Sequence, residues 1–407
     1  MKKTRLINYS LLSLLLLLAT ACEQFQNASG IKEIEPLSVT IGVTLNLGDN
    51  PMPSSLNVRL VNFAERYELT TTMSPDKSVT VDGILPGIYT VTVSGEENAD
   101  GFTYIYAGNA VNIDIVTDNK KLQVDVAVSR SSDLLFKEVY YCGSRTPSGG
   151  SYFRDQFYEI YNNGDAVQNV RGLCIAMINP MTATANLPVW PEPDADKYVY
   201  AISMWQVPDT TDFPLRPGES IIIAQMADDH QKPNLNPNSP VNLLSAEFET
   251  LVRTTSLIQD NPAINMTMAF WPRPTPQWLT TVFGGAFVLF FPTEPIDPNS
   301  PTEVVSPVGQ TSKNYRIPIE NVVDALENVG NPNQMELKRM PAVLDAGAAT
   351  VNGTYQAKSV ARKVKETLPD GRVILYDTNN STNDFEVMDT PMIRRYGAKA
   401  PSWNSWK

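Results

Sequence analysis

A strict alternation of apolar and polar residues is the feature that most restricts the fold of this chain. From Val39 to Leu45 every second residue is aliphatic, with threonine or glycine between. A period of two places successive side chains on opposite faces of an extended strand, so one face can be buried. Similar stretches recur at short intervals, at 58–61, 78–81, 89–93, 111–115 and 122–128. Regularly spaced short strands without intervening helices predict an all-β sandwich.

A second series of strand-like segments begins near Leu134 and predicts a second, larger β-sandwich. These segments lie at 135–141, 156–164, 170–173, 220–224 and 287–291. One segment is ambiguous, because Ile319, Val322, Val323 and Leu326 also have the i, i+3, i+4, i+7 spacing of a helix face. We interpret it as a strand, since adjacent β-branched residues favour a sheet. The predicted organisation is a signal peptide at 1–21, a tether at 22–36, and two all-β domains at 37–130 and 134–400.

The first residues predict export and a lipid anchor. Lys2, Lys3 and Arg5 precede an apolar run, and small residues at 19–21 precede Cys22. This order is typical of a secretory signal, and a cysteine directly after the small residues indicates a lipoprotein signal. We therefore expect the mature protein to begin at a lipid-modified Cys22. The alternative is a membrane-spanning helix, but the run is shorter than the roughly 20 residues that such a helix needs.

The charge balance excludes one class of partner. The sequence has 32 basic and 44 acidic residues and a formal net charge of −12. An acidic surface repels phosphate backbones and anionic headgroups. We expect no nucleic-acid partner, and no membrane binding beyond the lipid itself.

Cysteine and histidine are too scarce for several kinds of site. Once Cys22 is used as the anchor, only Cys142 and Cys174 remain. Cysteines of exported chains usually pair, so we expect a disulfide; two separate buried thiols are the alternative. The single histidine, His230, lies in a polar segment where we expect it to be exposed. Multi-histidine zinc sites are excluded, and we predict no catalytic residues and no enzyme activity, although a pair of carboxylates could still support hydrolysis.

One acidic loop is a candidate calcium site. Residues 377–384 offer side-chain oxygens from Asp377, Asn379, Asn383 and Asp384. Hard oxygen ligands of this kind suit Ca²⁺. The loop lacks the glycine and the distal glutamate of an EF-hand, and turns rich in Asp and Asn have the same composition without a metal. We therefore predict no cofactor, with calcium as the alternative at this loop.

Tryptophans near proline-rich segments are the candidate ligand-binding residues. They are Trp190, Trp205, Trp271 and Trp278, and the prolines cluster at 191–193 and 272–276. Rigid loops that carry tryptophan provide contact surfaces for sugars or proteins at a low entropy cost. The alternative is that these rings fold down onto the sandwich. The C-terminal segment, with Arg394 and Arg395, could similarly contact a partner or fix the terminus.

Two segments resemble known families. Residues 81–93, with Pro86-Gly87 followed by Tyr89 and alternating valines, resemble carboxypeptidase-regulatory and transthyretin-like modules, which implies a β-sandwich spacer. Most of 134–397 resembles lamin-tail-like domains, with insertions at about 180–205 and 230–285. This second resemblance is carried by 135–141, 156–164, 170–173, 213–224, 287–291, 322–327, 337–339, 377–385 and 390–391. It implies an immunoglobulin-like interaction module.

The whole order also resembles Bacteroidales-type exported lipoproteins of a domain-of-unknown-function family, through residues 204–208 and 260–262. That resemblance implies a location at the outer membrane, on its surface or periplasmic face, beside a nutrient receptor. We therefore expect a non-enzymatic binding protein that contacts a transporter, an envelope protein, a glycan or a small molecule. The alternatives are a secreted hydrolase that uses carboxylates and a structural or adhesin subunit.

Overall fold

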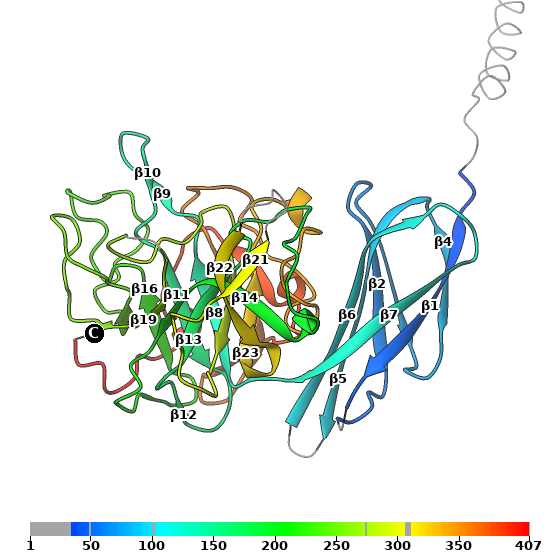
Figure 1. Cartoon of the computed structure of the whole chain (residues 1–407), viewed down its shortest axis with the longest axis horizontal. Coiled ribbons are helices and arrows are strands. Elements are labelled where there is room, and N and C mark those ends of the chain that lie inside the picture. Colours follow the sequence, from blue (N-terminus) through cyan, green and yellow to red (C-terminus); the bar gives the residue numbers. More distant parts are fainter. Residues whose placement is uncertain (1–33, 49, 100–101, 273–274, 306–310, 407) are drawn as a thin grey trace, which may run out of the picture.

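The computed structural model describes residues 34–48, 50–99, 102–272, 275–305 and 311–406. These residues form a small and a larger lobe, both built from strands, so the chain is all-β as predicted (Figure 1). Within the described ranges no helix has the length and apolar character needed to cross a bilayer. The predicted lipidation site, Cys22, lies outside these ranges.

The small lobe is a seven-stranded sheet that encloses one core. Its strands follow the order β3-β2-β5-β6-β7-β1-β4, and β1 runs parallel to β7. The apolar face of each strand enters a core that includes Val39, Ile41 and Val126. Tyr89 is fully buried there, and its hydroxyl donates to the Leu85 carbonyl at 2.7 Å. The strands are β1 (Leu37–Asn46), β2 (Leu56–Asn62), β3 (Tyr67–Met73), β4 (Val79–Ile84), β5 (Gly87–Ala99), β6 (Phe102–Ile115) and β7 (Lys120–Arg130).

The larger lobe packs two seven-stranded sheets face to face. The first sheet has the order β18-β17-β16-β11-β8-β24-β27. Its strands are β8 (Leu134–Tyr140), β11 (Phe157–Asn162), β16 (Ser220–Ala224), β17 (Phe248–Glu249), β18 (Ile264–Asn265), β24 (Ser359–Arg362) and β27 (Phe385–Met388).

The second sheet has the order β21-β22-β14-β13-β20-β23, with β19 paired to β14. Its strands are β13 (Cys174–Ile178), β14 (Tyr198–Gln206), β19 (Thr267–Phe270), β20 (Ala286–Phe290), β21 (Thr302–Val305), β22 (Thr311–Pro318) and β23 (Val322–Glu327). The ambiguous segment at 319–326 therefore contains a short 3-10 turn followed by a strand.

Small elements complete the larger lobe. Three two-stranded ribbons are β9 (Ser144–Arg145) with β10 (Ser151–Tyr152), β12 (Gln168–Asn169) with β15 (Pro214–Leu215), and β25 (Val364–Thr367) with β26 (Val373–Leu375). The helical turns are η1 (Ala195–Lys197), η2 (Ile319–Asn321), η3 (Pro332–Gln334), α2 (Ser381–Asp384) and η4 (Arg395–Gly397).

The strand β13 explains why the expected disulfide is wrong. All five of its residues are buried, because apolar layers cover both faces of the second sheet. Ile175 and Met177 enter the core between the sheets, which also contains Cys142. Cys174 points to the opposite face and joins a separate core. Both thiols are therefore free and buried.

The segment before β13 and the first proposed insertion also differ from the sequence interpretation. Residues 170–173 form a turn rather than a strand. Tyr198–Gln206, assigned mostly to an insertion, is the strand β14 and pairs with both β13 and β22. Because β14 lies inside the second sheet, it holds Tyr198 and Tyr200 in the candidate site.

Candidate functional site

A proline-rich loop closes over the start of β14 and contacts one tyrosine at two points. The ring of Trp190 stacks on Tyr200, with centroids 3.7 Å apart and planes within 7° of each other. The hydroxyl of Tyr200 donates to Glu192 Oε2 at 2.7 Å. Pro191 and Pro193 restrict the backbone between and beyond these contacts. The loop is thus held rigidly against the strand.

Arg316 on β22 joins this group from the neighbouring strand. It pairs directly opposite Tyr200 in the sheet, and its Nη1 lies 3.4 Å from Glu192 Oε1. Its guanidinium also lies over the ring of Tyr198, with Cζ 5.1 Å from the centroid. The Arg316 side chain is 49% exposed, so its ion pair adds little stability. It chiefly orients the side chains around Tyr198.

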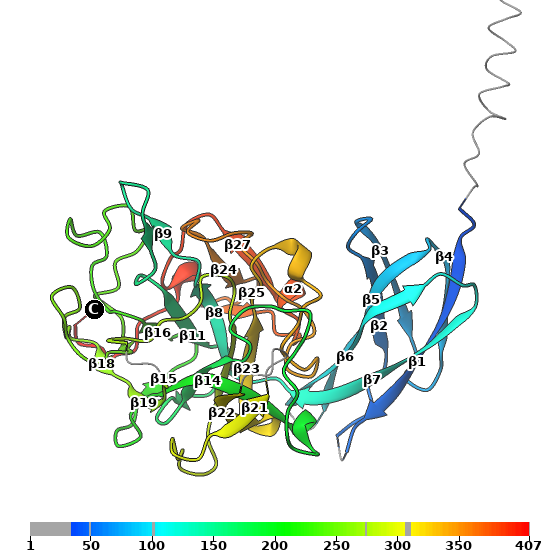
Figure 2. The same cartoon turned by 45° about the horizontal axis from the view of Figure 1, so that its top comes forward.

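Two clefts lie on either side of Tyr198, which lines both. The larger has a volume of about 460 Å³ and the smaller about 290 Å³. Figure 2 shows β14, β21 and β22 adjacent at this end of the larger lobe. The larger cleft is lined by Tyr198, Phe290, Pro292, Thr293, Glu294, Pro295, Asp297, Ser300, Tyr315, Arg316, Ile317, Pro318 and Asn321. The smaller is lined by Ile178, Asn179, Trp190, Ala195, Asp196, Tyr198, Val199, Tyr200, Arg339 and Pro341.

An exposed apolar margin borders the clefts. Val189 forms a bridge to Val305 at the edge strand β21, with its N–H 3.3 Å from the Val305 carbonyl. Val189 is 73% exposed and Val305 52% exposed. The site therefore combines aromatic rings, carboxylates, two amides and two guanidinium groups with a small apolar rim.

The four predicted tryptophans divide into two groups. Trp205, Trp271 and Trp278 are buried in the core between the sheets, as the alternative interpretation required. Trp278 donates to Ser203 Oγ at 2.8 Å, and Trp271 to Thr275 Oγ1 at 2.9 Å. Trp190 is half-buried and lines the smaller cleft. Of the four, it alone remains a candidate for ligand contact.

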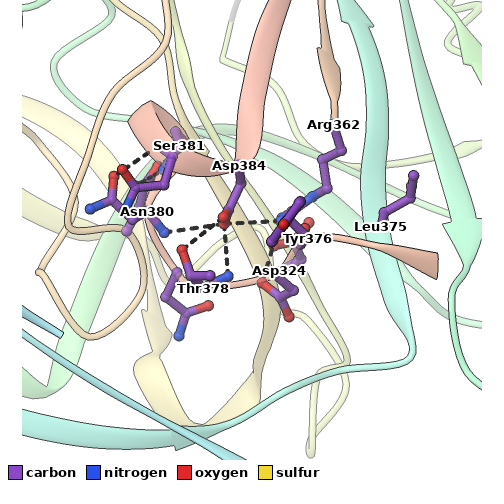
Figure 3. Close-up of polar contacts among 12 residues, drawn as sticks. Asp324, Arg362, Leu375, Tyr376, Thr378, Asn380, Ser381 and Asp384 are labelled. Atoms are coloured by element: carbon purple, nitrogen blue, oxygen red, sulfur yellow. Dashed lines mark hydrogen bonds and ion pairs between the residues drawn. The ribbon is translucent and has the colours of Figure 1, made fainter. Parts of the chain in front are cut away.

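The acidic loop at 377–384 packs against an arginine, Arg362, which lies beside Asp384 and Asp324 (Figure 3). The buried Arg362 guanidinium lies 2.6 Å from Asp324, 3.4 Å from Asp377 and 3.3 Å from Asp384. Asp384 also accepts hydrogen bonds from the N–H and hydroxyl of Thr378. Burial raises the pKa of Asp384 to about 6, against the opposing effect of Arg362. The guanidinium thus occupies the position between the carboxylates that a cation would need.

The other two candidate calcium ligands point elsewhere. Asn379 donates to Ser129 Oγ at 2.7 Å and to the Val343 carbonyl at 2.9 Å, so it joins the loop to the small lobe. Asn383 lines a separate hollow with Asn57 and Ser94 of the small lobe. Within the described ranges no three His, Cys, Asp or Glu side chains converge in a way that could hold a metal ion.

His230 is buried rather than exposed. Its Nδ1 lies 2.8 Å from the Tyr152 hydroxyl, and its Nε2 lies 2.9 Å from the Met226 carbonyl. The carbonyl can only accept, so the Nε2–H tautomer fits, with Nδ1 accepting from Tyr152. Burial lowers the pKa of His230 to about 4. The polar neighbours in sequence gave no sign of this, because contacts with distant residues cover the ring.

The residues that shape the clefts were not predicted from the sequence. Residues 198–202 form a short continuous run of aromatic and aliphatic side chains, which is typical of a buried strand. That signal could have identified β14. Tyr315 and Arg316 reach the site through strand pairing over more than a hundred residues, for which the local sequence holds no signal.

Comparisons with known proteins identify relatives but no characterised activity. The DUF4876 family, described as a protein of unknown function, matches residues 216–392. A crystal structure of a DUF4876 family protein from Bacteroides thetaiotaomicron VPI-5482 shares 40% sequence identity, with a TM-score of 0.65. The match covers 90% of this chain and 99% of that one.

A putative adhesin from Bacteroides ovatus ATCC 8483 is 8% identical over 70% of this chain and 83% of its own, with a TM-score of 0.18. That value is too low to carry an argument. No curated protein matches the chain.

Proposed function

Because this chain belongs to the DUF4876 family of proteins of unknown function, we propose a function from its own geometry. It is a non-enzymatic binding protein of the cell envelope, and its ligand occupies the clefts beside Tyr198. The observation that carries the proposal is that Tyr198 lines two clefts, the smaller of which is also lined by the stacked pair Trp190 and Tyr200.

The clefts have the properties of a preformed binding site. The larger one falls within the roughly 300–1,000 Å³ typical of small-molecule sites, and the smaller lies at the lower limit. The Trp190 loop is already ordered by its contacts with Tyr200. A ligand would therefore not have to order that loop on binding, which lowers the entropy cost of association.

The proposed location in the cell envelope rests on the signal-like residues 1–21 and on Cys22. A lipid at Cys22 would attach the chain to the outer membrane, and the tether and small lobe would hold the larger lobe away from the bilayer. The acidic chain is suited to contact with a transporter or another envelope protein, and a glycan or small molecule would fill the clefts.

A second candidate function has one supporting observation. Glu294 and Asp297 both line the larger cleft, and a glycosidase-type hydrolase needs at least one pair of carboxyl groups. Both side chains are exposed, whereas the general acid of such an enzyme needs a buried environment. Binding without turnover is the better fit.

The test uses the lipid-anchored chain in intact outer membranes. Bound molecules are recovered with the tagged protein, identified by mass spectrometry, and then titrated against the purified protein. We expect Tyr198→Ala to weaken binding of the recovered ligand at least tenfold. Tyr376→Ala is the matched control, because Tyr376 is 39% exposed and lies outside both clefts. Equal binding by the Tyr198→Ala and control proteins would overturn the proposal, and conversion of the ligand to products would favour the hydrolase.

A further inference from the structure

We infer that the two clefts take a neutral oligosaccharide, which lies across Tyr198 and contacts both. This inference rests on the proposed function and adds the chemical class of the ligand. It follows from three properties of the site, namely the arrangement of its aromatic rings, its polar groups and its balance of charge.

The aromatic rings provide flat surfaces of the kind that sugar rings need. Tyr200 covers one face of Trp190 at 3.7 Å, so ligand contact falls to the remaining exposed part of the indole. Tyr198 contributes to both clefts, and because the Arg316 guanidinium lies over its ring, sugar contact falls to the part of the ring that Arg316 leaves open. Aromatic faces attract the weakly positive C–H groups that a pyranose presents on its apolar face.

The polar groups of the larger cleft suit hydroxyl groups. Glu294 and Asp297 offer carboxylate acceptors, whereas Ser300 and Asn321 can both donate and accept. Asp297 is held in a turn, where its Oδ1 accepts from the Asn299 N–H at 2.8 Å. A sugar hydroxyl that donates to a carboxylate makes a charge-assisted hydrogen bond, which is stronger than a hydrogen bond between two neutral groups.

The charge balance argues against an anionic ligand. Two carboxylates line the larger cleft, and Arg316, the arginine that lines it, already contacts Glu192. The smaller cleft is lined by Asp196 and by Arg339, whose charge is paired with the buried Glu327. A phosphate or an acidic sugar would therefore meet an excess of negative charge. A basic peptide would satisfy these carboxylates but would leave the flat aromatic rings without a matching partner.

The clefts also predict how affinity depends on ligand length. Each cleft is small, and they meet at Tyr198, so a single sugar ring cannot fill both. Affinity should rise from monosaccharide to tetrasaccharide as the second cleft is occupied, and then level off. Because no ligand charge is involved, affinity should barely change between 50 and 500 mM NaCl.

The experiment titrates the mature protein with neutral gluco-, xylo-, manno- and galacto-oligosaccharides of one to seven units, by calorimetry. We expect at least one series to bind with the predicted length dependence. Tyr198→Ala should weaken that binding at least tenfold, Tyr198→Phe should retain most of it, and Tyr376→Ala should be unchanged. Intrinsic tryptophan emission confirms that each variant is folded.

Three results would overturn the inference. The first is failure of every neutral series to bind at millimolar concentration. The second is binding that Tyr198→Ala leaves intact, and the third is binding of polylysine that is lost at high salt while the sugars stay unbound. If a ligand recovered from membranes still depends on Tyr198 in those cases, the proposed function stands and only the carbohydrate class is wrong.

Discussion

Arg395 bonds to Glu138 across 257 positions of sequence, with Nε donating to Oε2 at 2.8 Å. A β-bulge lies at this contact, where the pairing of β8 with β11 shifts between Glu159 and Ile160. Lys137 is the extra residue, so Lys137 and Glu138 together face Glu159. The C-terminal segment covers these buried charges, and Arg394 and Arg395 thereby fix the terminus.

Replacing Arg395 should destabilise the larger lobe. Arg395→Gln leaves the fully buried Glu138 carboxylate with only its contacts to Ser359 and the Met392 N–H. Removing one partner of a buried ion pair costs about 3–5 kcal/mol. Because Arg395 is partly exposed, we expect a loss of about 2–3 kcal/mol in the free energy of unfolding.

The measurement is denaturant unfolding followed by tryptophan fluorescence. All six tryptophans lie between residues 190 and 406, so the signal reports the larger lobe. The matched control is Arg171→Gln, since the ion pair of Arg171 with Asp212 is exposed on both sides and should cost under about 1 kcal/mol. Similar losses for the two variants would contradict the role of Arg395.

Arg362→Met should be more damaging, and its effect should grow with pH. The variant leaves Asp324, Asp377 and Asp384 without their shared cation, at a cost of about 3–5 kcal/mol near pH 8. In the native protein burial already raises the pKa of Asp384 from 3.8 to about 6. The contribution of this carboxyl to stability is therefore complete below pH 4 and is lost as the pH rises through 6.

Without the guanidinium the pKa values of Asp324 and Asp384 rise further, so these two carboxyls stay protonated and nearly harmless at pH 5. Urea unfolding at pH 5 and pH 8 checks this expectation, with Arg216→Met as the exposed control. The difference between wild type and variant should be smaller at pH 5. A loss that is equal at both pH values would rule out the carboxylates as its cause.

His230 should stay neutral throughout the physiological range. Because it is the only histidine, selective labelling gives one imidazole signal whose shift can be followed by NMR. We expect a flat titration from pH 8 to 5 and a midpoint near 4. The stabilising effect of the neutral ring is complete above the ordinary pKa of 6.5 and is lost as the pH falls through 4. A midpoint near 6.5 would mean that the ring is exposed.

Both internal thiols should be unreactive until the protein unfolds. Burial raises the pKa of Cys142 and of Cys174, and the thiolate is the reactive form. In a Cys22→Ser protein kept without reductant, we expect no reaction with a thiol reagent in the native state and two modified cysteines in guanidinium. Failure to detect any thiol after unfolding would instead reveal a disulfide.

Local sequence was sufficient to predict several of the strands. Alternation at 39–45, 89–93 and 122–128 identified β1, β5 and β7, and adjacent valines correctly favoured a strand for Val322–Glu327. These predictions succeed because the period of side chains along a strand is a property of neighbouring residues. By contrast, β3 (Tyr67–Met73) was missed, since it lies at an edge of its sheet and three successive threonines interrupt its alternation of apolar and polar residues.

The sequence by itself determined an all-β chain with tyrosines, tryptophans and acidic loops at known positions. Only the tertiary structure decided what those side chains contact. Three tryptophans lie in the core, whereas Trp190 lines a cleft. The Arg362 guanidinium lies against the carboxylates of the acidic loop, and Cys174 points away from Cys142. Each outcome depends on strand pairing and sheet packing between distant residues, and a local pattern carries no information about which partner will arrive on the other face.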